Sequence, residues 1–229
     1  MSTSDTFGFN PALGSITLSA FARCGVRNAE VLAEHMQNAY CESNYLQSDW
    51  SADGIIWWTV ERVDQPLTYN APTYALPTNT VMVLDVYISP NNGQTGQNRL
   101  ILPFSRTDYA SLADPTQNGF PTSFWFDRAL APTITLWPVP DNSTTYLMSY
   151  YVYTQMEDAV LRSGGKAAIP YWWLNAYVAD LAHRLSRIYA PNLEQLRKAD
   201  RDEAYARACK QVEPNNMYIS PGLSGYFRS

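Results

Sequence analysis

The chain has 229 residues, of which 46% are hydrophobic and only 16% charged, and its formal net charge is -5. This composition excludes an intrinsically disordered chain. The negative balance argues against a surface that neutralises nucleic-acid phosphates. No stretch approaches the roughly 20 apolar residues of a membrane span, and the first ten residues lack the basic and apolar regions of a secretory signal. We therefore expect a folded protein made in a cytosol, without membrane association.

The N-terminal part predicts an arm followed by two helices. Residues 1–14 are polar with Gly and Pro, which favours an extended arm. Ser15 or Thr17 is expected to cap a short helix, ITLSAFARC, that ends at Gly25 in a left-handed conformation. Asn28 is expected to cap a second helix. Its predicted apolar stripe consists of Leu32, Met36, Ala39, Tyr40 and Leu46.

From residue 56 the hydrophobic period changes from 3.6 to 2, which indicates strands. Six segments are rich in β-branched and aromatic residues, namely WWTVERV, VMVLDVYI, RLILPF, SFWFDR, TITLWPV and TYLMSYYVY. Clusters of Pro, Asn and Gly separate them, as turns require. A single helical turn is expected within residues 105–113. Six short strands at hairpin-like spacing predict an antiparallel sandwich or an open barrel.

The C-terminal part predicts two antiparallel helices joined by a short turn. Pro170 precedes the first helix, whose apolar face recurs at i, i+3 and i+4 through Leu174, Tyr177, Val178, Leu181, Leu185 and Ile188. Pro191 ends this helix, and Asn192 is expected to cap the next one. The second helix runs to Pro214 with a thinner stripe of Leu193, Leu196, Ala199, Ala208 and Val212.

Two helices cannot close a core by themselves, so they need a partner from elsewhere in the chain. The helix expected over residues 28–46 is the best candidate, packed against the helix over 171–189. The predicted fold class is therefore α+β, with a helical bundle from the N- and C-terminal helices and an inserted antiparallel β-sandwich or open barrel. The expected boundaries are 1–54 and 156–213 for the bundle, 55–155 for the β-domain and 214–229 for an extended C-terminal arm.

The templates for catalysis fail in this sequence. Gly165-Lys166 lacks the residues of a phosphate-binding loop on both sides, and Ser224 lacks the last glycine of a nucleophile elbow. His35 and His183 lie on different predicted helices and are interpreted as surface residues. Asp127 and Asp141 end neighbouring strands and are typical of turns. We predict no enzymatic activity, no cofactor and no metal.

Aromatic residues make up 14% of the chain, which fits either an interface or a β-rich core. In a strand, adjacent tryptophans point to opposite faces. One of Trp57 and Trp58 is therefore expected to be exposed, and an exposed tryptophan more often contacts a protein than a sugar or a base. The three cysteines, Cys24, Cys41 and Cys209, are interpreted as reduced.

The order of these elements resembles the head-to-tail adaptor proteins of short-tailed phages, the family of tail tubular protein A, also called gatekeeper or tail accessory factor. The resemblance is spread over nearly the whole chain. It rests on LSAFARCGV, SDWSADGIIWW, YALPTNTVMVLDVYI, PFSRTDYASLADPTQNGFPTSFWFDR, ITLWPVPD, YWWLNAYVADLAHRLSRIYAP and the tail SPGLSGYFRS, in this order. That family has no catalytic motif to match.

The resemblance implies a structural virion protein, a dodecameric ring below the portal protein that carries the tail nozzle and tail fibre proteins. Such a ring extends the channel through which DNA passes without specific binding. Two other interpretations remain open. One is a carbohydrate-binding or glycan-cleaving β-domain on a helical stalk, and the other is a cellular scaffold protein.

Two groups of residues are candidates for contacts in such a ring. The C-terminal arm is too apolar for a solvated tail, and it is expected to dock on another subunit or on the portal through Tyr218, Ile219, Leu223, Tyr226, Phe227 and Arg228. The most polar long helix is expected to face the channel with Glu194, Asp200, Asp202 and Glu203. Acidic residues there would keep DNA from binding to the wall.

Overall fold

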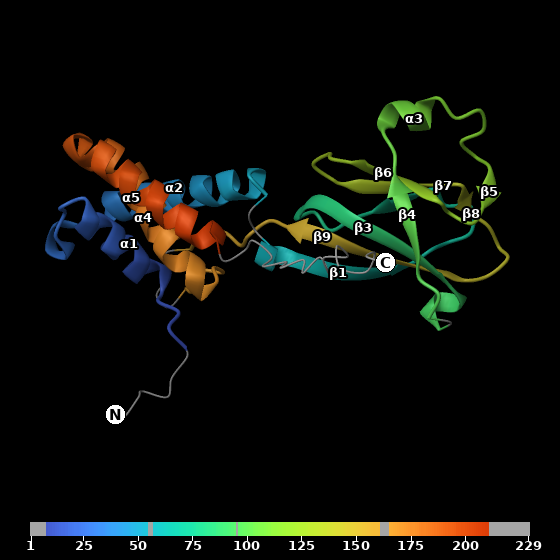
Figure 1. Cartoon of the computed structure of the whole chain (residues 1–229), viewed down its shortest axis with the longest axis horizontal. Coiled ribbons are helices and arrows are strands. Elements are labelled where there is room, and N and C mark those ends of the chain that lie inside the picture. The colour runs from blue at the N-terminus through green and yellow to red at the C-terminus, as the bar shows by residue number, and fades with distance from the viewer. Residues whose placement is uncertain (1–7, 55–56, 95, 161–164, 211–229) are drawn as a thin grey trace, which may run out of the picture. The chain divides into compact units, whose positions relative to one another are not determined.

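The computed structural model describes residues 8–54, 57–94, 96–160 and 165–210. The fold is mixed α/β, with helices and a seven-stranded sheet (Figure 1). The chain divides into two compact units. The helical unit comprises residues 1–43 and 159–229, and the sheet unit comprises residues 44–158.

Helix α4, Leu174–Tyr189, is the central helix of the helical unit. The predicted residues Tyr177, Leu181 and Leu185 are fully buried, whereas Ile188 is exposed. Burial extends around most of the helix, because the small residues Ala176, Ala179 and Ala182 are buried as well. Small side chains allow neighbouring helices to approach closely. Helix α4 packs against α1, Leu13–Arg23, and against α5, Glu194–Lys210.

The N-terminal helices depart from the sequence prediction at their starts. Helix α1 begins before Ser15, and the Thr17 hydroxyl donates to the Leu13 carbonyl inside the helix instead of capping it. Gly25 adopts the predicted left-handed conformation, with φ of +82°. Asn28 lies in a 3₁₀ turn, Asn28–Glu30, and helix α2 begins later, at Ala33–Ala52. The predicted caps Ser15, Thr17 and Asn28 are therefore wrong.

The predicted packing of α4 against the helix expected over residues 28–46 is also corrected. The main N-terminal partner is α1, which buries Leu13, Ile16, Ala20 and Phe21. Helix α2 reaches α4 through longer side chains, with Asn38 donating to the Tyr189 hydroxyl at 2.7 Å. Helix α1 is the partner because it buries the large apolar side chains of Leu13, Ile16 and Phe21, whereas Leu32, which we expected in the stripe of α2, is exposed.

Helix α5 follows α4 through a 3₁₀ turn, Pro191–Leu193. Asn192 lies inside this turn and is not the predicted helix cap. The buried positions of α5 are Ala204 and Ala208. Of the predicted stripe, Ala208 is buried as expected and Leu196 and Ala199 are exposed, whereas Val212 lies outside the described residues.

The sheet unit contains one curled sheet, which forms a half-barrel (Figure 1). Its strand order is β1-β9-β3-β4-β6-β7-β2. The strands are β1 Val60–Pro66, β2 Thr73–Ala75, β3 Thr80–Pro90, β4 Arg99–Pro103, β6 Ser123–Asp127, β7 Thr133–Trp137 and β9 Tyr146–Thr154. A small parallel pair joins β5, Asn118–Gly119, to β8, Val139–Pro140. The concave core consists of Tyr74, Leu76, Val83, Val86, Ile88, Ile101, Phe124, Ile134, Leu136, Tyr146, Met148, Tyr150 and Val152.

The sheet agrees with the open-barrel alternative, with two corrections. The pairing of β4 with β6 is parallel, whereas the other pairings of the seven strands are antiparallel. The pairing is parallel because β4 and β6 are not joined by a hairpin. Helix α3, Arg106–Ala110, and a long loop lie between the two strands and bring the chain back, so that β6 starts in the same direction as β4. Ser105 caps α3 by accepting from the Asp108 amide. The other correction concerns residues 57–59, which form a 3₁₀ turn before β1 instead of extending it.

Candidate functional site

An apolar groove on the helical unit is the best candidate site. It has a volume of about 630 Å³ and lies along α1 and the start of α4. Its lining is aromatic and aliphatic with a few small polar residues, namely Phe9, Pro11, Ser15, Ile16, Ser19, Arg23, Tyr171, Trp172, Leu174, Asn175 and Val178. Three of its aromatic side chains are strongly exposed, with exposed fractions of 69% for Phe9, 70% for Tyr171 and 52% for Trp172. Exposed aromatic rings gathered at one place indicate a contact surface.

The local backbone explains why these rings point outward. Residues Tyr171–Trp173 form a 3₁₀ turn that leads into α4, so adjacent side chains point in different directions. Trp173 is buried against Tyr205 of α5, and Trp172 is left at the surface. Phe9 makes an edge-to-face contact with Tyr171, with ring centres 6.4 Å apart. Aromatic pairs of this geometry are favourable and fix the wall of the groove.

The strand-like segment before α1 closes the other side of the groove. The Leu13 amide donates to the Gly165 carbonyl at 2.8 Å, and Ala12 forms an isolated antiparallel bridge with Lys166. The N-terminal segment is thereby attached to the segment that precedes α4. Pro11 belongs to the groove for this reason, although it is distant in sequence from α4.

One end of the groove is polar. The Arg23 guanidinium donates to the Asn175 side chain at 2.9 Å. Burial lowers the pKa of Arg23, and the carboxylate of Asp200 opposes this effect. Arg23 and Asn175 also line a second hollow of about 160 Å³, whose other residues, Asp200, Glu203, Ala204 and Arg207, come from α5. The site thus joins an apolar trough to a hollow that contains charges of both signs, which suits a peptide segment.

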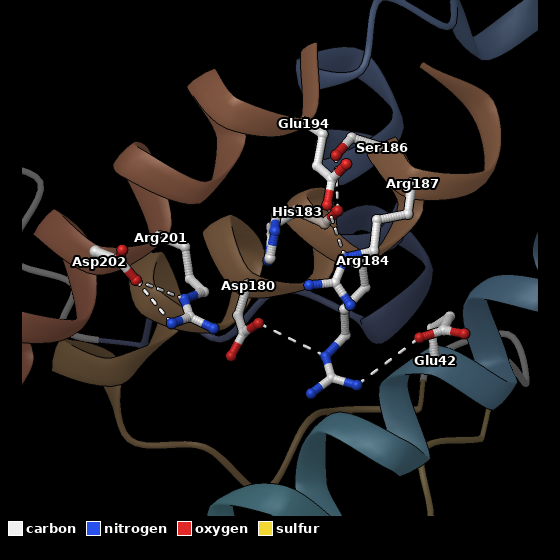
Figure 2. Close-up of polar contacts among 9 residues, drawn as sticks. All are labelled: Glu42, Asp180, His183, Arg184, Ser186, Arg187, Glu194, Arg201 and Asp202. Atoms are coloured by element: carbon white, nitrogen blue, oxygen red, sulfur yellow. Dashed lines mark hydrogen bonds and ion pairs between the residues drawn. The ribbon is translucent and has the colours of Figure 1, made fainter. Parts of the chain in front are cut away.

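Polar side chains of α4, most of them buried or partly buried, contact residues of α2 and α5 in the same unit (Figure 2). Arg184 lies 3.6 Å from the Asp180 carboxylate and 3.8 Å from Glu42 of α2. His183 is only 2% exposed, and its Nε2 has no hydrogen-bond partner within the described residues. Burial lowers the pKa of His183, and the neighbouring Arg187 and Arg201 lower it further. Asp180 and Glu194 act in the opposite direction.

The two histidines are therefore not the solvated surface residues that we expected. His35 accepts a hydrogen bond on Nδ1 from the Leu32 amide at 3.0 Å. Its ring packs against Tyr189 and Phe21, with the Tyr189 ring centre at 4.8 Å. The ring of His35 thus packs between helices, and His183 is buried on α4. Within the residues that the structure describes, no group of His, Cys, Asp or Glu is arranged to hold a metal ion.

The four acidic residues expected at a channel wall lie on α5, but each has an arginine partner. Asp200 lies 2.8 Å from Arg197, Asp202 lies 2.7 Å from Arg201, and Glu203 pairs with Arg207. Glu194 lies 3.2 Å from Arg187 of α4 (Figure 2). Asp200 and Glu203 line the small hollow, whereas Asp202 does not. This helix therefore presents paired charges instead of a purely acidic face.

The other predicted contact residues, Tyr218, Ile219, Leu223, Tyr226, Phe227 and Arg228, lie outside the described residues. The adjacent tryptophans with one buried and one exposed ring are Trp172 and Trp173. Trp57, whose side chain lies outside the described set, and Trp58 belong to a 3₁₀ turn instead of the expected strand.

The carboxylates required by a glycan-cleaving site belong to opposite ends of one strand pair. Asp127 pairs with Thr133 at the start of β7, whereas Asp141 follows β8, beyond the other end of β7. The length of β7 corresponds to about 13 Å at the usual rise per residue. Asp141 accepts from Ser143 and from the Tyr146 hydroxyl, and these hydrogen bonds lower the pKa of Asp141. It serves a turn.

No family model and no curated protein matches this chain. Among the described residues, no helix is both long and apolar enough to cross a membrane.

Sequence reasoning missed the groove because its two halves are far apart in the chain. Phe9 and Pro11 belong to a segment expected to be a polar arm, and Tyr171 to the start of a helix. The sequence did contain a local signal for the exposed rings. An aromatic run directly after Pro170, at a helix start where side chains turn outward, indicates exposed rings.

Proposed function

We propose that this chain is a structural virion protein, the head-to-tail adaptor of a short-tailed phage. In this proposal the helical unit is a bundle of N- and C-terminal helices, and the sheet unit is a domain inserted into it. About twelve copies form a ring between the portal protein and the tail nozzle, and DNA passes through the ring. The resemblance of the ordered sequence segments supports the family, and the ring order depends on that resemblance alone.

The observation that carries the proposal is the groove with its exposed aromatic rings. An assembly protein needs a surface that stays exposed in the single chain and becomes buried in the complex. Phe9, Tyr171 and Trp172 form such a surface at the edge of the helical unit. Head-to-tail contacts between unlike surfaces close into rings when the rotation per subunit permits it.

The charge distribution agrees with a channel that DNA passes without binding. The chain has a net charge of -5, and each of the four acidic residues considered on α5 is paired with an arginine. A near-neutral wall releases few counterions and therefore holds DNA weakly. We propose no catalytic role for the chain and no cofactor.

Electron microscopy of the protein alone and mixed with the portal of the same phage tests this proposal. The expected images show rings with a central opening, seated coaxially on the portal. Particles of single subunits that do not bind the portal would contradict it. Cleavage of peptidoglycan or capsule polysaccharide that Asp141→Asn abolishes in a folded protein would support the glycan-cleaving alternative instead.

A further inference from the structure

We propose that the groove binds residues 214–229 of a neighbouring copy of this chain. This contact rests on the proposed function, because it would join one subunit of the ring to the next. The occupant of the groove is the C-terminal arm, residues 214–229, and each copy places its arm in the groove of a neighbour.

The composition of the arm matches the lining of the trough. Residues 214–229 include six large apolar or aromatic side chains, Met217, Tyr218, Ile219, Leu223, Tyr226 and Phe227. Pro214, Pro221, Gly222 and Gly225 have low helix propensity, so the sequence of this segment does not predict an amphipathic helix. The groove offers complementary aromatic and aliphatic walls, which are the usual acceptors of such side chains.

The end of α5 brings the arm to the correct part of the molecule. The last described residue, Lys210, follows Arg207 by less than one helical turn, and Arg207 lines the small hollow at the polar end of the groove. The 19 remaining residues, counted from Gln211 to Ser229, span at most about 65 Å when extended. An arm of this length can leave its own helical unit.

The polar end suits the single cation of the arm. Arg228 follows Tyr226 and Phe227 directly. The side chain of Glu203 is 64% exposed at the hollow, and that of Asp200 is 42% exposed. With the rings in the groove, Arg228 can share one of these carboxylates with its arginine partner on α5, because an ionised carboxylate accepts several hydrogen bonds.

A closed ring requires that the arm bind the groove of a neighbouring copy instead of its own. A ring needs two different surfaces on each subunit, a donor and an acceptor. An arm that occupied the groove of its own chain would consume both surfaces at once. The groove and the arm are the complementary pair that this chain carries in its described helices and its remaining sequence.

Two full-length variants isolate the two surfaces. The variant Ser19→Trp fills the trough from α1, where Ser19 is exposed and lines the groove. The double variant Tyr226→Ser/Phe227→Ser removes the arm's rings. Ala22→Trp is the matched control, because Ala22 is an exposed residue of α1 that does not line the groove. Circular dichroism and the thermal midpoint verify that each variant folds.

Sedimentation velocity then measures association, without portal or DNA. Wild type and Ala22→Trp are expected to form oligomers at micromolar concentration, whereas each surface variant alone sediments as a monomer. An equimolar mixture of the two variants is expected to form a pair, because one supplies an intact arm and the other an intact groove. A synthetic peptide of residues 214–229, in excess, is expected to shift wild type toward monomer at least tenfold.

A mixture that stays monomeric while wild type associates would overturn the proposal, because another surface would then join the copies. Oligomers of Ser19→Trp as stable as wild type would overturn it as well. A monomeric wild type in which only the double variant binds the peptide would show that each arm occupies its own groove. The adaptor function has a separate test, since failure to bind the portal leaves these results unchanged.

Discussion

Helices α4 and α5 are neighbours of nearly equal length, 16 and 17 residues, yet they use their side chains in opposite ways. Helix α4 is buried around most of its circumference, and the buried residues include the ionisable Asp180 and His183. Helix α5 buries little more than Ala204 and Ala208 and pairs its charges at the surface. One helix stabilises the unit, and the other covers one side of it.

This difference shows where the chain can change without loss of the fold. Substitutions in α4 remove buried contacts or leave charges without partners, which are the mechanisms of large destabilisation. Substitutions on the outer side of α5 affect solvated ion pairs, whose contributions are small. A surface used for assembly can therefore evolve on α5 and along the groove while α4 maintains stability.

The largest expected effect is at the centre of α4. Leu181→Ala is expected to lower the free energy of unfolding by about 2–5 kcal/mol, because Leu181 is fully buried and a cavity would remain. Leu196→Ala on α5 is the matched control, since Leu196 is 52% exposed, and it is expected to change stability by less than about 0.5 kcal/mol. Urea titration measures both. Equal losses would mean that the two helices do not differ as described.

A second prediction uses the buried His183. Its pKa is lowered in the folded chain by burial and by Arg187 and Arg201, so the unfolded chain binds more protons below about pH 6.5. Stability is therefore complete above that pH and falls as the pH decreases, by at most about 1.4 kcal/mol per pH unit. The variant His183→Gln is expected to reduce this slope between pH 6.5 and 5. An unchanged slope would assign the acid sensitivity to other groups.

The smallest expected effect is on the outer side of α5. Glu203→Gln breaks the solvated pair with Arg207 and is expected to change the free energy of unfolding by less than about 0.5 kcal/mol. Thermal unfolding at low and high salt measures the change, which should disappear at high salt. A loss above about 1 kcal/mol would show that this pair contributes more than a solvated ion pair does.

The sequence predicted the elements with strong periodicity and failed where packing decides between equivalent options. The stripe of α4 was predicted at Tyr177, Leu181 and Leu185, and β3, β4, β6, β7 and β9 were predicted within a few residues. The stripe of α5 was predicted correctly at Ala208 and wrongly at Leu196 and Ala199, because so few of its residues are apolar that the pattern did not define one face. Strand β2 has only three residues, Thr73–Ala75, which is too short for an alternating pattern.

The candidate site was less predictable than the fold. The groove depends on a bridge between Ala12 and Lys166, a contact between distant segments that no local pattern contains. The burial of His183 was likewise hidden, because one polar residue on an apolar helix does not show how many neighbours surround that helix. The acidic residues of α5 and the arginines interleaved with them were visible in the sequence, and the pairs of Asp200 with Arg197 and of Glu203 with Arg207 follow the helical spacing.

The most direct test of the central claim, that this chain is a structural part of the virion at the head-to-tail junction, is immunogold labelling of purified virions of the phage that carries it. The account predicts label at one vertex of each particle, where the tail joins the head, after the tail fibres are removed to expose it. Virions that contain the chain elsewhere, or that lack it by mass spectrometry while cell lysates contain it, would contradict the account.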